Sequence, residues 1–567
     1  MATSTGQAAS KPSTKAKYGG DIVVGIGDTF PGFCVSQIPN HSALGGFRLI
    51  YEQLFERTVA GEYVGALAES GTPNADFTQW TIKLRQGIKF HNGEAFNADA
   101  VKLNIDLNSG LYNAQNSSAP AAFREPGKGY ASTGYGVNAN IINVAKVDDY
   151  TIRIDLNESQ NDFLGVLYRA GRYIMRAPAQ LRTSAGAPEP TCASKAIGTG
   201  PYTLVSWTPD SLNVTKNADY WRRHPVNGDK LPYIDNITFI NVKEPSQRAA
   251  AVRKGTIDAG SFSSSDGTFI LDLAKRKSLV TQYKAQPLWF GSWVPNINKT
   301  GSIFTSKNCR LAVGYAIDWN AYNKVRLKGL GIVSGSIVTK GHPMFNLENA
   351  PKYNVTAAKD YVAKCKTDMG KTDVGWALYA DTSTSSQNHE KFLRKYLNDA
   401  GFTMLNPDVK EAGQHIGDIY ANSFGVTQKT LTQGTPAEGG DSAYVSIFYR
   451  SSAFPTGHKS PVAATAIGKY YSKVIALSNT NDTKIDQLIS AAQAATTNAA
   501  ANAKWREMTA YLQAEGYQLP TVHGTFWTFV NNKAKLRGIG QLPIIKGKTP
   551  QVVTNKGLDW TGIWQDK

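Results

Sequence analysis

Side chains that could carry catalysis or hold a metal are scattered through this chain without the spacing that such chemistry needs. The eight histidines include no pair four residues apart, so the H-E-x-x-H pattern of a helical zinc site is absent. The segment 457–460, Gly-His-Lys-Ser, lacks the adjacent Gly-Lys and the earlier glycine of a phosphate-binding loop. No G-x-S-x-G elbow stands before a predicted helix. The sequence therefore predicts no catalytic residue, no metal site and no cofactor.

Net charge is the most unusual bulk property of the chain. Its 567 residues carry 61 Lys and Arg against 44 Asp and Glu, a formal charge of +17. A nucleic-acid-binding surface needs its basic residues clustered with aromatic ones, whereas the densest basic groups here are short, as at 275–277. Charged residues make up only 19%, so uncharged polar residues must cover much of the surface, as in many secreted proteins. We expect no nucleic-acid partner.

Length and hydrophobicity indicate several folded domains. A content of 41% hydrophobic and 10% aromatic residues excludes global disorder. No stretch approaches 18 apolar residues, so no membrane span is expected. The first 17 residues contain no acidic and no aromatic residue and are expected to form a flexible tether. They also lack the apolar run of a signal peptide, as a processed mature form would.

The four cysteines leave two interpretations open. Cys34, Cys192, Cys309 and Cys365 lie far apart and form no C-x-x-C pair, which argues against a zinc or thioredoxin-type site. One or two structural disulfides in an oxidising compartment fit the sequence, and buried free thiols fit it equally.

Residue patterns predict alternating strands and helices along the chain. Strands are expected at 21–26, 80–85, 151–156 and 236–242, and a hairpin at 203–215. Helices are expected at 47–55, after an Asn97 N-cap, and at 246–253, where Gly255 ends the helix. Beyond about residue 288, longer helices are expected at 308–328, 355–366, 388–400, 483–496 and 500–515. The pattern is that of an α/β protein.

Four sequence blocks follow one another along the chain. They are 67–70 with 77–101, 197–202 with 216–221, 231–235 with 248–258, and 309–318. Together they resemble the extracytoplasmic solute-binding proteins of ABC importers, in the large oligopeptide-, dipeptide- and nickel-binding class (family 5, cluster C). We interpret the blocks as structural: Gly198, Gly200 and Pro201 shape the entry to a strand, and Asp318 caps or braces its helix.

The resemblance implies the two-lobed periplasmic-binding-protein type II fold, an α/β architecture with an extra inserted domain and a hinged ligand cleft. We place domain I, in lobe 1, at 18–65, 190–288 and 522–567. Domain II, an insertion that extends lobe 1, is placed at 66–189, and domain III, which forms lobe 2, at 289–521.

The chain is expected to cross between the lobes near 287–296 and near 520–529. Both segments are rich in aromatic residues, which bury a large area with few rotamers to freeze. Such residues suit a ligand cleft, and they suit an interlobe core equally well. We predict ligand contacts for residues at these crossings, after the first strand and at 448–451: Phe33, Trp289, Phe290, Trp293, Phe448, Tyr449, Arg450, Ser451 and Trp527.

The segment 448–455 departs from a Trp-x-x-Asp-Tyr-x-x-Pro pattern by which peptide-binding members are similar to one another. In that pattern the Asp pairs with the α-ammonium of the peptide. Aligned on Pro455, the Asp becomes Ser451, and burying an ammonium without a carboxylate is strongly unfavourable. Ordinary α-amine recognition therefore needs another acid. Arg450 could instead meet a carboxylate or phosphate with its guanidinium fork, which favours an anionic organic ligand or modified peptide.

The resemblance implies a receptor and not an enzyme. Such a receptor captures a small solute by closure of its lobes and delivers it, as a monomer, to the membrane permease of an ABC importer. Its location would be the cell surface or periplasm, with a lipid anchor in the full-length precursor. Three alternatives stay open: an oligosaccharide receptor, a nickel-complex receptor that draws on His41, His415, His458 or His523, and an extracytoplasmic enzyme or scaffold on this fold.

Overall fold

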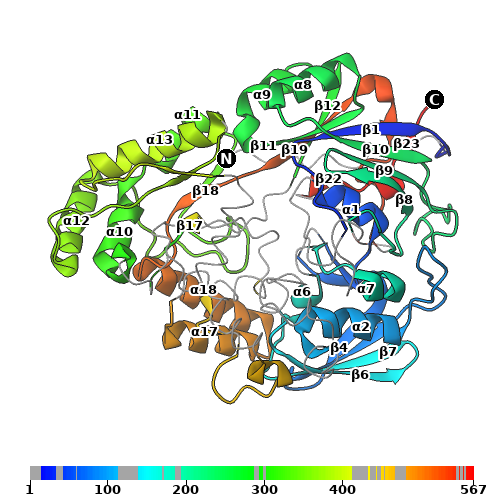
Figure 1. Ribbon diagram of the computed structural model, residues 1–567, viewed down its shortest axis with the longest axis horizontal. Helices are drawn as coiled ribbons and strands as arrows, with labels where there is room; N and C mark the ends of the chain where they lie inside the picture. The colour runs from blue at the N-terminus through cyan, green and yellow to red at the C-terminus, as the bar shows by residue number, and fades with distance from the viewer. Residues whose placement is uncertain are drawn as a thin grey trace.

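Three bodies surround the centre of the molecule (Figure 1). The computed structural model describes residues 15–33, 43–58, 61–112, 138–168, 171–184, 193–285, 293–295, 297, 302–382, 384–410, 432–433, 442, 449–452, 454–465, 480–544, 548, 553–554 and 557–567. Among these residues, no helix combines the length and apolar character that a bilayer crossing requires. Of the predicted tether, residues 15–17 are described, and Lys17 forms an ion pair with Asp566 at 2.7 Å.

A seven-stranded mixed sheet, in the order β12-β19-β11-β1-β10-β9-β8, lies in the segments predicted as domain I. The strands are Asp21–Ile26 (β1), Tyr202–Thr208 (β8), Ser211–Lys216 (β9), Asn236–Asn241 (β10), Ala259–Ser263 (β11), Val280–Lys284 (β12) and Phe526–Asn531 (β19). Strand β1 is parallel to β10 and β11, and the other pairs are antiparallel. Helices α8 (Pro245–Lys254) and α9 (Gly267–Ala274) cover one face, and α1 (Leu44–Ile50) covers the other (Figure 1).

The predicted hairpin and the Gly255 helix end are both confirmed in this domain. Strands β8 and β9 pair antiparallel, and Gly255 takes φ 79° at the end of α8. The expected helix at 47–55 is shorter and earlier, since α1 ends at Ile50 and residues 55–57 form a strand.

A four-stranded antiparallel sheet, in the order β4-β5-β7-β6, lies in the segment predicted as domain II. Its elements are Ala68–Pro73 (β4), Gln79–Leu84 (β5), Ile141–Asp148 (β6), Thr151–Leu156 (β7), Ala98–Ser109 (α2), Phe163–Tyr168 (α6) and Pro178–Ser184 (α7). The Asn97 side chain accepts a hydrogen bond from the Ala100 N–H, as the predicted N-cap requires. Phe454 and Val462, from the segment placed in domain III, pack into the domain II core. The chain of domain III therefore reaches across to domain II.

Helices dominate the described part of the segment predicted as domain III: Lys307–Ala316 (α10), Trp319–Arg326 (α11), Val355–Met369 (α12), Thr384–Asp399 (α13), Thr483–Gln493 (α17) and Asn498–Ala514 (α18). The single helix expected at 308–328 is two helices, because the backbone becomes extended at Ile317. Asp318 then caps α11 by accepting hydrogen bonds from the N–H groups of Asn320 and Ala321, both at 2.9 Å. The capping role predicted for Asp318 is confirmed.

A disulfide joins Cys309 on α10 to Cys365 on α12. For this pair the structure decides between the two interpretations that the sequence left open. Cys34 and Cys192 lie outside the described residues.

Two glycines of the second sequence block lie against the end of α1. A Cβ at Gly198 would stand 2.0 Å from the Ile50 carbonyl oxygen, and one at Gly200 2.4 Å from that of Leu49. The Gly200 N–H donates to the Ile50 carbonyl oxygen at 2.9 Å. These glycines permit a close approach of two backbones, as their structural interpretation requires.

Short strand pairs connect the larger elements. They are Phe55–Arg57 (β2) with Tyr63–Gly65 (β3), Trp293–Val294 (β13) with Thr432–Gln433 (β17), Ile332–Ser334 (β14) with Thr521–His523 (β18), Tyr379–Ala380 (β15) with Asp408–Val409 (β16), Leu536–Arg537 (β20) with Trp564–Gln565 (β23), and Val553–Thr554 (β21) with Gly557–Leu558 (β22). Strand β18 pairs with β14, within the segment predicted as domain III, whereas β19, three residues later, pairs with β11 in the seven-stranded sheet. The chain therefore passes from one sheet to the other at residues 524–525, and a lobe crossing in the segment 520–529 stays a prediction.

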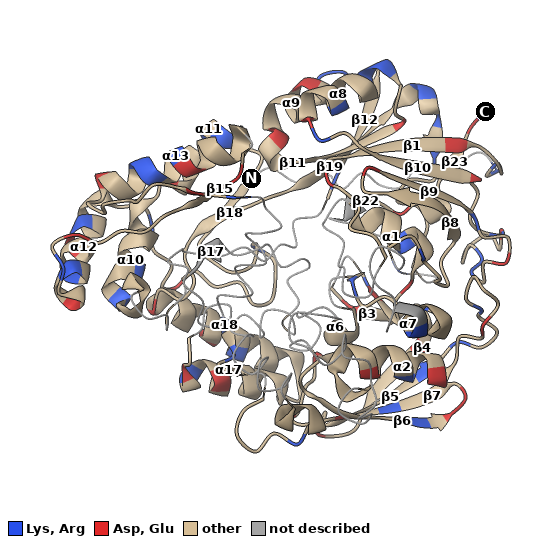
Figure 2. Ribbon diagram, in the orientation of Figure 1, with Lys and Arg blue, Asp and Glu red and all other residues tan. Residues whose placement is uncertain are grey.

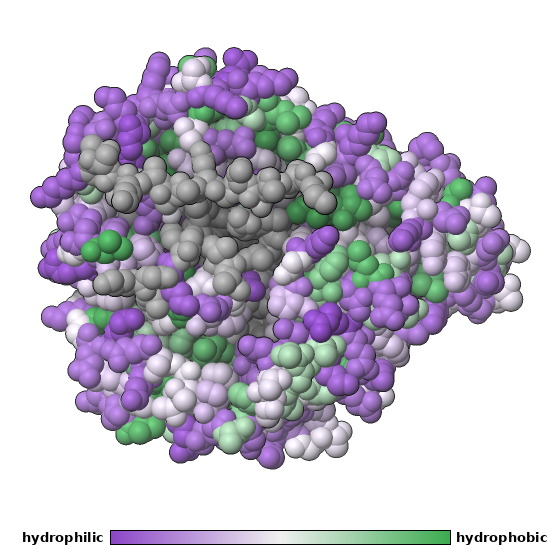
Figure 3. Space-filling model, turned by 180° about the vertical axis from the view of Figure 1, so that it is seen from behind, coloured by the Kyte–Doolittle hydropathy of each residue, from purple (hydrophilic) through white to green (hydrophobic). Residues whose placement is uncertain are grey.

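Charges of both signs are spread over all three bodies in the view of Figure 2. Seen from behind, the surface is mainly hydrophilic, with apolar residues in small groups (Figure 3). The net charge is therefore spread over the surface and does not form a single basic face in these views.

Candidate functional site

The hinge crossing at Thr525 is held to both sides by buried, uncharged hydrogen bonds. The Thr525 hydroxyl donates to the Leu330 carbonyl oxygen at 3.0 Å and accepts from Trp527 Nε1 at 3.2 Å. Its N–H donates to the Ser264 hydroxyl at 3.3 Å, and the Ser264 N–H donates back to its carbonyl oxygen at 2.9 Å. The Thr525 side chain has no exposed surface. The crossing is therefore fully buried and hydrogen-bonded to segments on both sides.

Trp527, which we predict to contact ligand, lies beside this crossing in the core of domain I. The residue is 6% exposed, and the ammonium of Lys284 lies 4.9 Å from the ring centroid. Ligand contact by Trp527 stays a prediction.

Phe33 packs deep in a second hydrophobic cluster, which is separate from the one that contains Trp527. Its ring centroid lies 4.7 Å from that of Phe47 and 6.2 Å from that of Tyr51, and the residue has no exposed surface. In this conformation Phe33 therefore has no surface to offer a ligand, so the predicted contact would require residue 33 to move.

The segment 449–452 brings three predicted residues together on domain III. Tyr449 is fully buried in the core formed by α17 and α18, and its carbonyl oxygen accepts from the Thr480 hydroxyl. The N–H of Ser451 donates to Asp486 Oδ1 at 3.0 Å, and the Ser451 hydroxyl donates to Asp486 Oδ2. Asp486 stands in the first turn of α17. A carboxylate therefore lies directly against the position where the peptide-binding pattern has its aspartate.

Arg450 points its guanidinium fork at protein partners on both sides of the lobe boundary. Nη1 lies 3.3 Å from Glu158 Oε2 on domain II, and Nη2 donates to Gln493 Oε1 on α17 at 2.8 Å. The Arg450 side chain is 20% exposed and that of Glu158 is 37% exposed. In this conformation Arg450 joins domain II to domain III, and its predicted contact with a ligand stays a prediction.

Two further residues of domain II extend this junction. The N–H of Asn161 donates to the Gln493 carbonyl oxygen at 2.9 Å, and its side-chain amide donates to the carbonyl oxygens of Ala492 and Ala495. The Asp162 carboxylate accepts from Ser442 and from Gln493 Nε2, and burial raises the pKa of Asp162. We call this set the interlobe contact: Glu158, Asn161, Asp162, Ser442, Arg450, Ser490 and Gln493.

The remaining predicted residues cannot be compared with the structure. Trp289, Phe290 and Phe448 lie outside the described residues, and for Trp293 only the backbone pairing of β13 with β17 is described. Of the histidines considered for nickel, His523 contacts the Ser336 carbonyl oxygen at 3.2 Å and His458 Nδ1 accepts from the Ser460 N–H. In the described part of the chain, no group of three or more His, Cys, Asp and Glu residues is placed to hold a metal.

Sequence reasoning missed the domain II side of the interlobe contact and missed Asp486. One signal was available: residues 157–162 are six consecutive polar residues between strand β7 and the apolar helix α6. Such a polar loop at the edge of a domain is where binding contacts are often found. No sequence signal links Asp486 to Ser451, because the contact spans 35 residues and depends on the fold.

Comparisons with known proteins agree with this architecture. The sequence pattern of bacterial extracellular solute-binding proteins, family 5 Middle, matches residues 62–450. The glutathione-binding protein GsiB of Shigella boydii serotype 4 is 25% identical over 400 residues, which cover 70% of this chain and 71% of the relative. GsiB of Escherichia coli strain K12 is also 25% identical over 400 residues, with the same coverage of both chains.

Solved structures share the whole fold. The periplasmic binding protein DppA from Helicobacter pylori, in complex with the peptide STSA, has a TM-score of 0.76 at 19% identity, covering 97% of this chain and 99% of that one. The binding protein AgaA from A. tumefaciens R10, in complex with agropinic acid, has a TM-score of 0.74 at 18% identity, with the same coverage of both chains.

The fold and its hinge therefore define a two-lobed periplasmic-binding-protein type II receptor. The chain belongs to family 5 of the bacterial extracellular solute-binding proteins. It is an extracytoplasmic receptor that binds a small solute and delivers it to the permease of an ABC importer.

Proposed function

We propose that the solute is a short peptide-like molecule with a free amine, that Asp486 is the counter-ion of this amine, and that the interlobe contact holds the lobes closed over it. The observation that carries the proposal is the pair of hydrogen bonds from Ser451 to Asp486. They fix a carboxylate beside the position where peptide-binding members have their aspartate.

The chemistry of this pair supports an amine. Ser451 donates two uncharged hydrogen bonds to Asp486, so the negative charge of the carboxylate is not neutralised by that partner. Each carboxylate oxygen can accept more than one hydrogen bond. An ammonium between the closed lobes would therefore find both a charge and acceptor positions.

The relatives support the same class of solute. The curated relatives are named for glutathione, and DppA was solved with the peptide STSA. AgaA was solved with agropinic acid, so a small acid that is not a peptide is a second class of solute among the relatives.

A substitution at Asp486 tests the proposal. In Asp486→Asn, we expect affinity for a panel of short peptides and glutathione to fall at least about tenfold, as measured by isothermal titration. N-acetylated peptides should bind the wild-type protein weakly and be insensitive to the substitution. Asp399→Asn, which alters an exposed carboxylate paired with Lys395, is the matched control. Unchanged affinity of Asp486→Asn for free-amine peptides would contradict the proposal.

A second candidate is an anionic solute held by Arg450, because the Glu158 partner of Arg450 is half-exposed and lies at 3.3 Å. A ligand carboxylate that replaced Glu158 would use the same guanidinium fork. In Glu158→Gln this candidate predicts tighter binding of anionic solutes, whereas an interlobe role for Arg450 predicts weaker binding of every solute.

We further propose that the protein has no catalytic activity of its own. The solute should stabilise the protein against heat in proportion to its concentration. It should also be recovered unchanged after prolonged incubation, and a new product in that incubation would contradict this part of the proposal.

A further inference from the structure

A pocket inside lobe 1 lies between domain I and domain II, apart from the interlobe contact. It encloses about 440 Å³, a volume suited to a small organic molecule. The end of α1, the segment 220–225 and the C-terminal residues Leu542, Ile544 and 557–561 line one side, while residues near β2, β3 and β5 line the other. All of its lining residues come from lobe 1. A molecule bound there would stay in contact with lobe 1 whether the lobes were open or closed.

Arginine is the only basic residue type among the lining residues. Five arginines stand against two glutamates and one aspartate, which leaves two positive charges in excess. A guanidinium presents its N–H groups as a fork that fits carboxylate and phosphate oxygens. The composition of the wall therefore favours an oxyanion.

The acidic residues of the pocket already have partners. Glu52 accepts from Tyr220 Oη at 2.8 Å, Trp221 Nε1 at 2.8 Å and Thr199 Oγ1 at 2.9 Å. Glu56 pairs with Arg48. The ion pair with Arg48 offsets the charge of Glu56, and the neutral donors occupy acceptor positions of Glu52.

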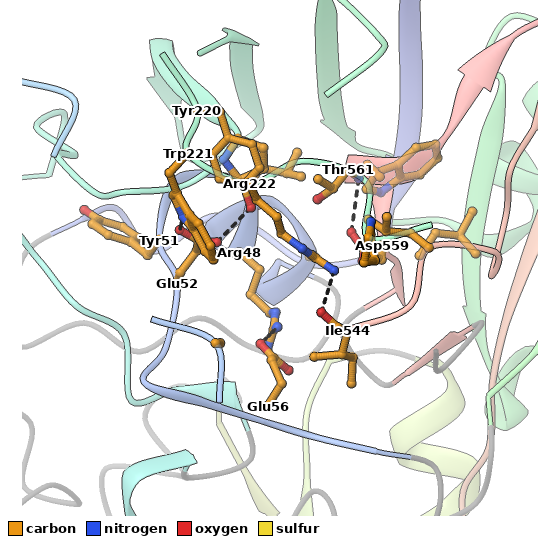
Figure 4. A pocket seen from close by; sticks show the side chains of 18 of the residues that line it. Arg48, Tyr51, Glu52, Glu56, Tyr220, Trp221, Arg222, Ile544, Asp559 and Thr561 are labelled. Carbon is orange, nitrogen blue, oxygen red and sulfur yellow. Dashed lines mark hydrogen bonds and ion pairs between the residues drawn. The ribbon is translucent and has the colours of Figure 1, made fainter. Parts of the chain in front are cut away.

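Several arginine nitrogens have no partner among the described residues. Nη1 of Arg48 is buried without a hydrogen bond, although Nη2 of the same fork contacts Glu56. Arg222 uses only Nη2, which donates to the carbonyl oxygens of Pro543 and Ile544. Arg85 uses only Nε, which donates to Ala66, and its guanidinium carbon lies 5.7 Å from the centroid of the Trp221 ring. Figure 4 shows Arg222 extending across the pocket toward Asp559 and Ile544, with Arg48 directed at Glu56.

We propose that this pocket binds a small organic anion with two or more oxyanion groups, carboxylate or phosphate, through Arg48, Arg85 and Arg222. A buried, unfilled guanidinium position is costly, as at Nη1 of Arg48, and an anion with several oxygens could contact this position together with the partly exposed guanidinium groups of Arg85 and Arg222. The site is separate from the solute site of the receptor, and its occupant is not the transported solute.

Citrate is the probe for the carboxylate form and inorganic phosphate is the probe for the phosphate form. Isothermal titration at a constant ionic strength near 0.15 M should give a dissociation constant below about 1 mM for at least one of them. In Arg222→Gln that affinity should fall about tenfold or more. Arg276→Gln, which removes an exposed arginine outside the pocket, should leave it unchanged. If Arg222→Gln does not fold, Arg85→Gln gives the same test.

Two results would overturn the proposal. Equal binding by wild type, Arg222→Gln and Arg276→Gln would show general attraction to a basic protein. The absence of binding by both probes would show that the pocket does not take oxyanions. The test is independent of the proposed function, because Asp486→Asn and Arg450→Ala should leave citrate or phosphate binding unchanged, and Arg222→Gln should leave peptide binding unchanged.

Discussion

The lobes meet at two kinds of junction, and these differ in chemistry. At the hinge crossing, Thr525 is fully buried and every hydrogen bond joins uncharged groups. At the interlobe contact, Arg450 and Glu158 are charged, partly exposed and 3.3 Å apart. Buried uncharged bonds are expensive to break without water to replace them, whereas exposed ion pairs exchange readily with solvent. We therefore expect the contacts at the crossing to persist and the interlobe contact to form and break.

The largest expected effect comes from the hinge. Thr525→Val keeps the shape of the side chain but removes the bond to Leu330 and the acceptor for Trp527 Nε1. We expect the free energy of unfolding to fall by about 2–3 kcal/mol, measured by chemical denaturation. Thr281→Val, at an exposed threonine bonded to Asn532, is the control and should change it by less than about 0.5 kcal/mol. If Thr525→Val and Thr281→Val lowered the free energy of unfolding equally, the hydrogen bonds at Thr525 would be no stronger than an ordinary surface bond, which contradicts the prediction.

A smaller effect on stability, but a clear one on binding, is expected at the interlobe contact. Arg450→Ala removes the bonds to Glu158 and Gln493, which in the proposed function form only when the lobes close. We expect solute affinity to fall about fivefold or more through this shift of population. The free energy of unfolding should change by only about 1 kcal/mol.

Small-angle X-ray scattering supplies the direct readout of that prediction. The solute-free Arg450→Ala protein should have a larger radius of gyration than the wild type, and Lys395→Ala, at an exposed ion pair, should not. A variant that binds solute and scatters like the wild type would show that Arg450 does not hold the lobes together.

The smallest expected effect is a pH dependence centred on Asp162. Burial raises the pKa of Asp162, although hydrogen bonds from Ser442, Gln160 and Gln493 and the nearby Arg450 act in the opposite direction. A raised pKa means that the Asp162 carboxyl holds its proton more tightly in the folded protein than in the unfolded chain. The stabilisation is therefore present at low pH and is lost as pH rises through the raised pKa.

Asp162→Asn should remove this contribution. The melting temperature at pH 7 minus that at pH 4 should be more positive in the variant than in the wild type, because the variant lacks the low-pH stabilisation by Asp162. The other carboxylates contribute equally to both proteins. An Asp162→Asn protein with an unaltered pH profile would show that Asp162 does not titrate in the interlobe contact.

Local sequence signals predicted the elements of this fold well, and long-range contacts were beyond their reach. The Asn97 cap and the Gly255 helix end depend on residues within a few positions of each other, so their spacing is visible in the sequence. The break between α10 and α11 was missed because the apolar periodicity continues through it, although Asp318 was identified as a cap. Arg450 and Glu158 are 292 residues apart, and only the fold brings them together.

The candidate site shows the same limit. Ser451 was identified because it departs from a short motif, yet Asp486, which pairs with it, carries no mark of that role in the sequence. The Cys309–Cys365 disulfide shows the same limit. The sequence alone left free thiols open at these positions, and only the packing of α10 on α12 shows that the two cysteines are joined. The lobe 1 pocket collects residues from 45 to 561, a separation at which a single sequence gives no pairing information.

The most direct test of the receptor's proposed solute is mass spectrometry of small molecules released when the purified protein is denatured. We predict a short peptide-like molecule with a free amine, near one equivalent per chain in the wild type and depleted in Asp486→Asn. Release of a sugar or a nickel complex, or equal amounts of an amine-free acid from both proteins, would contradict the proposal.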